Sequence, residues 1–234
     1  MSLPIAEHLR RHTTDDLDPH VVYIVDDDPN VREAVEDLLA SCGYRTVVSG
    51  SATEYMTLAK ADVPACLILD VNLPDYNGLD LQAQLAGARH PPIVFITGHG
   101  DVPSSVRAMK AGAVDFLAKP FSPQALLVAV DTALARDLHA RAAAAELADL
   151  VARYATLTPR ERDVLPLVVS GLLNKQAAAV LDISIVTLQI HRRNVMRKMA
   201  ARSLAELVRM AGRLDILRDD RYASPAPCVR VPLA

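Results

Sequence analysis

Tryptophan is absent from the 234-residue chain, and aromatic residues make up only 4% of it. With so few large side chains, a hydrophobic fraction of 51% must fill the interior mainly with Ala, Val and Leu, which suits helices packed on a sheet. Long apolar runs are also missing, because none approaches the ~18 residues that a membrane-spanning helix requires. The first twenty residues contain His, Arg and Asp where a signal peptide would have an apolar core. We therefore expect a cytoplasmic protein without a membrane segment.

Cysteine is scarce as well. Cys42, Cys66 and Cys228 are widely separated, without the paired spacing of a disulfide framework or a zinc site. We expect all three to be reduced thiols.

The small net charge of −3 hides an asymmetry along the chain. Residues 21–121 contain 7 Lys and Arg against 13 Asp and Glu, whereas residues 157–218 contain 11 against 5. The first part should repel a polyanion and the second should attract one. A solvated charged face would give the same counts, so charge alone does not identify a partner.

Short apolar runs alternate with helix-length segments over the first half of the chain. Five runs have the length of strands: Val21–Val25, Tyr44–Val48, Ala65–Leu69, Ile93–Thr97 and Val114–Ala118. Four helices are predicted between them at Val31–Ser41, Ala52–Ala59, Leu79–Ala86 and Val102–Ala111, and another begins near Pro123. This alternation predicts a doubly wound α/β domain with a parallel sheet, whose functional crevice lies beyond the carboxyl ends of the strands.

Helices dominate the rest of the chain. Residues 123–154 are Ala-rich and lack Gly, which predicts a nearly continuous helix that becomes a linker. Thr158, Pro159 and Glu161 form the pattern of a capping box at the start of the next helix. Three further helices are predicted at Asn174–Leu181, Ser184–Met199 and Ser203–Ala211, the last with its own Ser203-x-x-Glu206 box.

These patterns divide the chain into five parts. We predict a flexible leader at 1–19, an α/β domain at 20–136, a helical linker at 137–156, an all-α domain at 157–214 and a flexible tail at 215–234.

Polar residues follow four of the five predicted strands. Asp26, Asp27 and Asp28 follow the first strand, and Asp70 follows the third. Thr97 ends the fourth strand and Lys119 follows the fifth, so one edge of a parallel sheet would gather carboxylates, a hydroxyl and an ammonium group.

Such a crevice has restricted chemistry. Clustered carboxylates repel one another, so one must take up a proton or a hard cation such as Mg²⁺ must neutralise them. Asp70 is then the candidate nucleophile for a phosphoryl group, since Mg²⁺ and Lys119 would neutralise the incoming charge. Taken singly, each Asp is typical of a helix cap or turn, and Lys119 of a solvated surface. The combination favours a site.

At these residues the sequence resembles the receiver domains of two-component response regulators. The matching segments are residues 24–28, 67–74, 96–101 and 116–121, and the resemblance covers about residues 20–136. It implies a flavodoxin-like five-stranded domain in which Asp70 accepts the phosphoryl group. It also implies Asp26, Asp27, Asp70 and the main-chain carbonyl of Asn72 as Mg²⁺ ligands. Thr97, Phe116 and Lys119 would contact the phosphoryl group or report its arrival, and the Lys119–Pro120 peptide is expected to be cis.

Residues 157–213 resemble the four-helix DNA-binding domain of FixJ, NarL and LuxR-type transcription factors, with the FixJ branch the most similar. The segments that carry the match are residues 157–162, 170–171, 174–175, 191–199 and 201–207. The resemblance implies a helix-turn-helix unit whose second helix lies at 184–199.

The spacing on that helix separates a core face from a DNA face. Leu188, Val195 and Met199 should face the core, leaving Gln189, Arg193 and Arg197 on the opposite stripe. Gln189 and Arg193 are candidates to read adenine and guanine, and Ile190 to touch a thymine methyl group. Phosphate contacts are expected from Lys175, Thr187, Arg192 and Lys198. For any one of these residues, a solvated basic helix is the alternative.

Three residues depart from the family pattern. Pro166 lies inside the first helix of the DNA-binding domain and predicts a kink. Gln189 stands where many relatives carry Lys, and Asp182 replaces a frequent turn Gly. We expect an altered operator preference with binding retained.

The resulting hypothesis is a phosphorylation-dependent transcriptional regulator and not an enzyme. A sensor histidine kinase would phosphorylate Asp70, and shifts of Thr97 and Phe116 would remodel the face formed by the predicted fourth helix and fifth strand. A homodimer would then bind a double-stranded operator, with RNA polymerase as a further partner. Leu204, Leu207, Val208 and Ala211 could pair the last helix with its copy or pack into their own domain. Two alternatives remain open: a phosphotransfer module whose helical end binds protein, and a magnesium-dependent phosphohydrolase.

Overall fold

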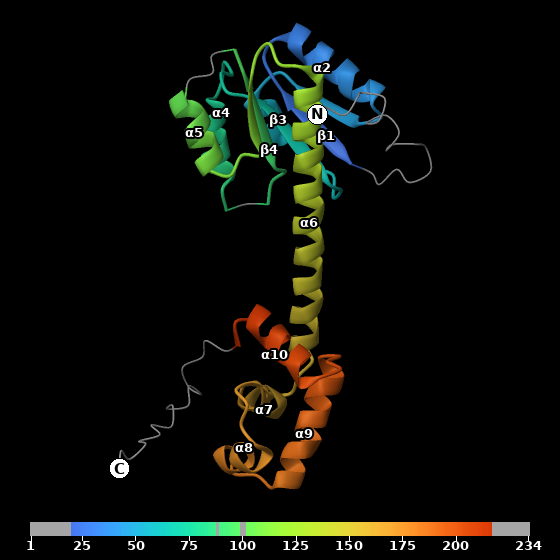
Figure 1. The fold of residues 1–234 in the computed structure, drawn as a ribbon, viewed down its shortest axis with the longest axis vertical. Helices are drawn as coiled ribbons and strands as arrows, with labels where there is room; N and C mark the ends of the chain where they lie inside the picture. The colour runs from blue at the N-terminus through green and yellow to red at the C-terminus, as the bar shows by residue number, and fades with distance from the viewer. Residues whose placement is uncertain (1–19, 88, 99–101, 217–234) are drawn as a thin grey trace, which may run out of the picture. The chain divides into compact units, whose positions relative to one another are not determined.

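The computed structural model describes residues 20–87, 89–98 and 102–216. This part of the chain forms two compact units that divide between Ala142 and Ala143, inside helix α6 (Pro123–Ala155), which is a single helix as predicted (Figure 1). The predicted leader, Cys228 and nearly all of the predicted tail lie outside the described residues. Within the described ranges, no helix has both the length and the apolar character needed to cross a membrane.

The first unit contains a five-stranded parallel sheet, as predicted. Its strands are β1 (Val21–Val25), β2 (Arg45–Ser49), β3 (Ala65–Asp70), β4 (Ile93–Thr97) and β5 (Asp115–Ala118). They lie in the order β2-β1-β3-β4-β5, and every neighbouring pair is parallel. Each observed strand limit lies within one residue of the predicted limit.

Helices connect the strands and cover both faces of the sheet. They are α2 (Pro29–Ser41), α3 (Ala52–Thr57), α4 (Gly78–Leu85) and α5 (Val102–Lys110), followed by α6. Asp28, Ser51 and Asn77 cap α2, α3 and α4 by accepting hydrogen bonds from main-chain N–H groups of the first turn.

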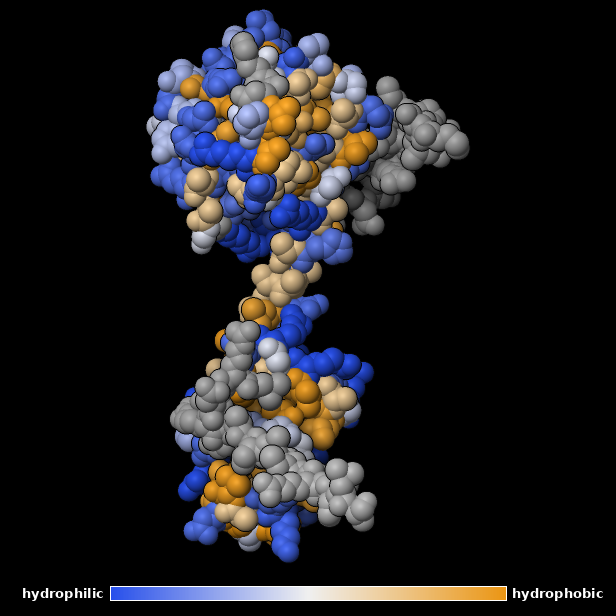
Figure 2. Space-filling model, turned by 60° about the vertical axis from the view of Figure 1, so that its left-hand side comes forward, coloured by the Kyte–Doolittle hydropathy of each residue, from blue (hydrophilic) through white to orange (hydrophobic). Residues whose placement is uncertain are grey.

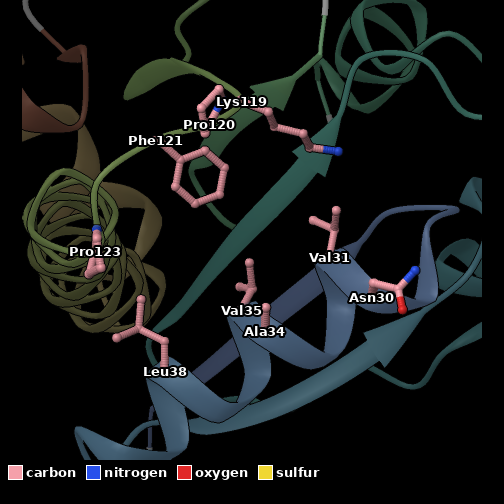
Figure 3. Close-up of a pocket in the computed structure, with 9 residues that line it drawn as sticks. All are labelled: Asn30, Val31, Ala34, Val35, Leu38, Lys119, Pro120, Phe121 and Pro123. Carbon is pink, nitrogen blue, oxygen red and sulfur yellow. The ribbon is translucent and has the colours of Figure 1, made fainter.

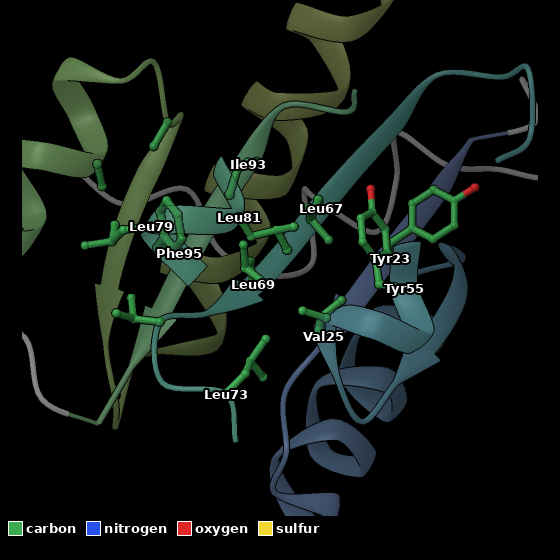
Figure 4. Packing of buried hydrophobic residues seen from close by; sticks show 14 of the residues in the cluster. Tyr23, Val25, Tyr55, Leu67, Leu69, Leu73, Leu79, Leu81, Ile93 and Phe95 are labelled. Carbon is green, nitrogen blue, oxygen red and sulfur yellow. The ribbon is translucent and has the colours of Figure 1, made fainter. Parts of the chain in front are cut away.

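Alternate residues of each strand pack into a separate core on either side of the sheet. Tyr23, Leu67 and Phe95 lie in the core beneath α3, α4 and α5, which Figure 4 shows. Ile24 and Ile68 lie in the opposite core, against α2 and α6. The buried residues are mostly Ala, Val and Leu, as the composition predicts, and Cys42 and Cys66 are buried free thiols.

The second unit is helical. After α6 come α7 (Pro159–Val169), α8 (Asn174–Val180), α9 (Ile185–Lys198) and α10 (Leu204–Arg213). Leu188, Val195 and Met199 of the α9 segment are fully buried in one core with the other helices, as predicted.

Local contacts explain where these helices begin and turn. Thr158 and Glu161 form the predicted capping box of α7. The box predicted for α10 forms only in part, because Glu206 accepts a hydrogen bond from the main-chain N–H of Arg202 and not from that of Ser203. Asp182, in the turn before α9, has a positive φ of 51°, a conformation that favours Gly and that Asp tolerates.

Helix α7 continues through Pro166 as one element, and Ser170 N–H still donates to the carbonyl of Pro166 at 3.0 Å. The kink therefore stays a prediction.

Candidate phosphoacceptor site and nucleic-acid interface

The strand order brings the predicted acidic residues to one edge of the sheet. Since β1 and β3 are neighbours, Asp26 and Asp70 lie side by side at their carboxyl ends. One carboxylate oxygen from each of Asp26, Asp27 and Asp70 lies within 4.8 Å of the others. Asp27 is exposed, so solvent reaches the cluster on that side, whereas Asp26 and Asp70 are buried.

Asp26 is held in place by contacts on both of its oxygens. Its Oδ1 accepts a hydrogen bond from Asp28 N–H at 2.9 Å, and its Oδ2 lies 2.5 Å from Lys119 Nζ. Arg32 Nη1 donates to the carbonyl oxygen of Asp26 at 2.6 Å. These contacts from Asp28, Arg32 and Lys119 hold the loop after β1 in place.

Asp70 is buried yet keeps a free oxygen. Its Oδ1 has no hydrogen-bond partner among the described residues, and Lys119 Nζ lies 3.6 Å away, beyond hydrogen-bond distance. Burial raises the pKa of Asp70 to about 6; Lys119 opposes the shift, and the charges of Asp26 and Asp27 add to it. A carboxylate in this position favours a cation or an electrophile at Oδ1.

These residues fit the Mg²⁺ that the resemblance implies. Mg²⁺ prefers hard oxygen ligands, and here three carboxylates converge, one of them with a buried oxygen that accepts no hydrogen bond from the described residues. Asn72, the fourth predicted ligand, lies in the loop after β3, which an isolated bridge between Asn72 and Asn77 closes. Gly78 permits that loop, because a Cβ atom at this position would lie 2.4 Å from the carbonyl oxygen of Asp70.

The predicted switch residues lie on the neighbouring strands. Thr97 is fully buried at the end of β4, and its carbonyl accepts a hydrogen bond from Lys119 N–H at 2.7 Å. The Lys119–Pro120 peptide is cis, as predicted. Phe116 on β5 is half-buried and packs against Phe95, with ring centroids 6.1 Å apart.

An apolar groove that the sequence did not predict adjoins Lys119. Its volume is about 620 Å³. Val31, Ala34 and Leu38 of α2 line one side, and Pro120 and Phe121 line the other (Figure 3). Lys119 thus borders both the acidic cluster and this groove. The signal could have been the wide apolar face of α2, whose Val31 and Leu38 are only partly buried against the core.

The predicted DNA face of α9 is exposed. Gln189, Ile190, Arg193 and Arg197 are all exposed, opposite the buried core residues, and Lys175 is exposed in the first turn of α8. Thr187 lies in the first turn of α9, where its N–H donates to the capping hydroxyl of Ser184 at 3.0 Å. Sequence reasoning overlooked Val186, which is exposed on the same face.

Two of the predicted phosphate contacts are engaged inside the unit. Arg192 Nη1 donates to Asn174 Oδ1 at 2.8 Å. Lys198 Nζ lies 2.6 Å from Glu161 Oε2 and donates to the carbonyl of Thr156 at 3.1 Å. Lys198 is therefore not part of the exposed stripe formed by Gln189, Arg193 and Arg197.

Glu161 is the buried partner in this pair and a residue that sequence reasoning used only as a cap. Burial by itself would raise the pKa of Glu161. The hydrogen bonds from Lys198 and Thr158 lower the pKa by more than burial raises it, so the pKa lies below its usual range. Glu161 thus joins the start of α7 to the end of α9.

Exposed apolar residues occur on both units among charged ones (Figure 2). On α5, Val102, Val106 and Met109 are exposed and lie at helical spacing on one face. On α10, Leu207 and Ala211 are buried in the core of their own unit, which favours packing within the domain over pairing with a second copy, the two alternatives that the sequence left open.

Comparisons with known proteins agree with this geometry. Residues 22–131 match the model of the response regulator receiver domain, and residues 155–211 match that of bacterial regulatory proteins of the luxR family. The chain is 50% identical to Nodulation protein W of Bradyrhizobium diazoefficiens, over 84% of this chain and 87% of that protein. It is 40% identical to the transcriptional regulatory protein FixJ of the same organism, over 85% and 97%. The solved structure of the response regulator StyR is similar with a TM-score of 0.73 and 43% identity, over 82% and 98%.

FixJ is a transcriptional regulatory protein and StyR a response regulator, so the comparisons favour a regulator over the phosphohydrolase alternative. The chain belongs to the response regulators that join a receiver domain to a LuxR-type helix-turn-helix DNA-binding domain, and it is not an enzyme.

Proposed function

We propose that the protein is a phosphorylation-dependent regulator of transcription in which Asp70 accepts a phosphoryl group from a sensor histidine kinase. The observation that carries the proposal is the buried Oδ1 of Asp70 within the carboxylate cluster, which accepts no hydrogen bond from the described residues. This oxygen attacks phosphorus, the bond to the kinase histidine breaks, and the released imidazole nitrogen keeps the electron pair and takes up a proton.

The charge of the incoming group is neutralised locally. Asp26, Asp27, Asp70 and the carbonyl of Asn72 would hold Mg²⁺, which supplies Lewis-acid stabilisation of the phosphoryl oxygens. Lys119 already lies 3.6 Å from Asp70 Oδ1, so its ammonium group can contact a phosphoryl oxygen after a small movement.

The groove between α2 and residues 119–123 supports the choice of partner. It is apolar, adjoins Lys119 and is open to solvent, so a helix of the kinase that inserts apolar side chains there would present its histidine near Asp70.

Phosphorylation is proposed to reach the DNA through dimerisation. A phosphoryl group on Asp70 would draw the Thr97 side chain and release Phe116, and both lie on the strands next to α5. The exposed stripe Val102, Val106 and Met109 supports α5 and β5 as the dimer face. Two subunits then match two operator half-sites.

On the operator, the exposed stripe of α9 is proposed to enter the major groove. Gln189 and Arg193 would read bases, and Lys175 and Thr187 would contact phosphates, whereas Arg192 must first leave Asn174. The DNA-bound dimer would act on RNA polymerase in the cytoplasm.

Selection from random duplex DNA, with and without Mg²⁺ and acetyl phosphate, tests the proposal. Wild-type protein should enrich a motif with two half-sites, more strongly after phosphorylation, and Asp70→Asn should lose the enhancement while keeping its fold. Phosphate-independent dimerisation would refute the regulatory step. Failure to enrich any motif would refute DNA binding and favour the alternative in which the helical domain binds protein.

A further inference from the structure

Two aliphatic side chains on α9 are more than half exposed, and a third, Ile185, is 44% exposed. Val186 is 66% exposed and Ile190 is 56% exposed, whereas Leu188 and Val195 of the same helix are fully buried. Large aliphatic groups facing water on a basic helix contribute nothing to the core of the unit.

Their spacing puts both residues on the DNA face. At 3.6 residues per turn, Val186 and Ile190 lie on one side of the helix, directly opposite Val195. Gln189 and Arg193 lie three and seven residues beyond Val186, so the polar and aliphatic groups share one stripe. Val186 also belongs to the first turn of α9, and the first turns of recognition helices contact base edges.

We propose that Val186 reads the 5-methyl group of a second thymine, so that it and Ile190, whose thymine contact the sequence predicts, read the two thymines that flank the base pair read by Gln189. Thymine is the one standard base that presents an apolar group in the major groove, so an aliphatic pair distinguishes it from the other bases. The flanking Arg193 and Arg197 match the charge of a phosphate backbone, which favours DNA over an apolar protein partner. This proposal rests on the DNA-binding function proposed above.

The test removes single methyl groups from the ligand. The full-length protein, treated with Mg²⁺ and acetyl phosphate, is titrated with a duplex from the selection experiment in which one thymine at a time is replaced by uracil. The hydrogen-bonding edge stays the same and only the methyl group is lost. We expect about a fourfold weaker affinity at two positions of each half-site, which corresponds to the loss of one buried methyl group at each.

Variants then assign each position to a side chain. In Val186→Ala, replacing thymine by uracil should no longer change the affinity at one of the two positions. In Ile190→Ala the same should hold at the other position, and alanine keeps the helix intact in both variants. Val151→Ala, which shortens a valine on α6 that is 51% exposed, is the matched control and should keep both wild-type ratios.

The outcomes separate this proposal from the function on which it rests. Equal affinity for thymine and uracil at every position would overturn methyl recognition and leave DNA binding standing. Unchanged ratios in Val186→Ala would overturn the role of Val186 and favour a protein partner for it. If the selection enriches no duplex, the proposed function itself fails.

Discussion

A buried carboxylate fastens the linker helix to the receiver domain. Asp137 is 5% exposed, and its Oδ2 accepts hydrogen bonds from Ala65 N–H at 2.8 Å and Arg141 Nε at 2.6 Å. Arg141 also pairs with Asp62 at 2.7 Å. The sequence predicted a receiver that ends at residue 136, before these contacts; we propose that it extends to Ala142. Replacing Asp137 by alanine should therefore destabilise the receiver.

The size of the effect follows from the two contacts. Leaving the buried N–H of Ala65 without an acceptor costs about 1–3 kcal/mol. Arg141 keeps Asp62 and remains 19% exposed, so losing its second partner adds about 1 kcal/mol. The free energy of unfolding should fall by about 3 kcal/mol, which lowers the unfolding temperature of a domain of this size by roughly 10 °C. Asp137→Asn keeps an acceptor for Ala65 and should cost about 1 kcal/mol.

Calorimetry of the full chain measures the loss, and hydrogen–deuterium exchange locates it. In Asp137→Ala, exchange should accelerate at the amide of Ala65, while the amides of α9 keep wild-type rates. A change below about 0.5 kcal/mol, the usual scatter of neutral surface substitutions, would show that Asp137 does not fasten the helix in this way.

Further predictions concern the acidic cluster and the DNA-binding domain. In Gly78→Ala the new Cβ atom would meet the Asp70 carbonyl, so the free energy of unfolding should fall by about 2 kcal/mol or more and labelling of Asp70 by acetyl phosphate should slow. Gel separation of the phosphorylated protein measures the labelling. Chelation of Mg²⁺ should stop that labelling and readdition should restore it, whereas labelling without metal would contradict the ligand set. Glu161→Ala leaves Lys198 with only the carbonyl of Thr156 and removes the acceptor of Thr158 N–H, so it should destabilise the DNA-binding domain by about 3 kcal/mol in thermal unfolding. Since the pKa of Glu161 is lowered, its stabilising contribution should be complete at neutral pH and be lost as the pH falls through that lowered pKa.

The fold and the acidic cluster could be predicted because both depend on local patterns. Strand limits such as Val21–Val25 follow from the apolar runs and their bounding polar residues. Once the strands are parallel, topology alone brings Asp26 and Asp70 to one edge. The core face of α9 likewise follows from helical spacing.

Pairings between distant residues could not be predicted. Asp137 contacts a main-chain group 72 residues away, and Lys198 finds Glu161 across 37 residues. In the sequence each resembles an ordinary solvated charge on a helix, and only tertiary packing distinguishes them. Val186 was overlooked for the opposite reason, because an aliphatic residue in a helix is by default assigned to the core.

The helical stability of the middle of α6 depends mainly on its amino-acid composition. Residues 142–149 are all exposed and follow the last receiver contact, Arg141, while Leu150 begins the core of the next domain. No side chain of this stretch is buried, and its side-chain contacts are the exposed ion pairs of Glu146 with Arg213 and of Asp149 with Arg153, which stabilise little. The stretch therefore depends mainly on main-chain hydrogen bonds, and five of its eight residues are Ala, the strongest helix former. Exchange at these amides should therefore be faster than at 126–133 and should accelerate further in an Ala144→Gly, Ala145→Gly variant. If signalling needs a continuous helix, that variant should bind Mg²⁺ and accept phosphate normally but lose phosphate-dependent DNA binding; retained coupling would show that dimerisation alone carries the signal.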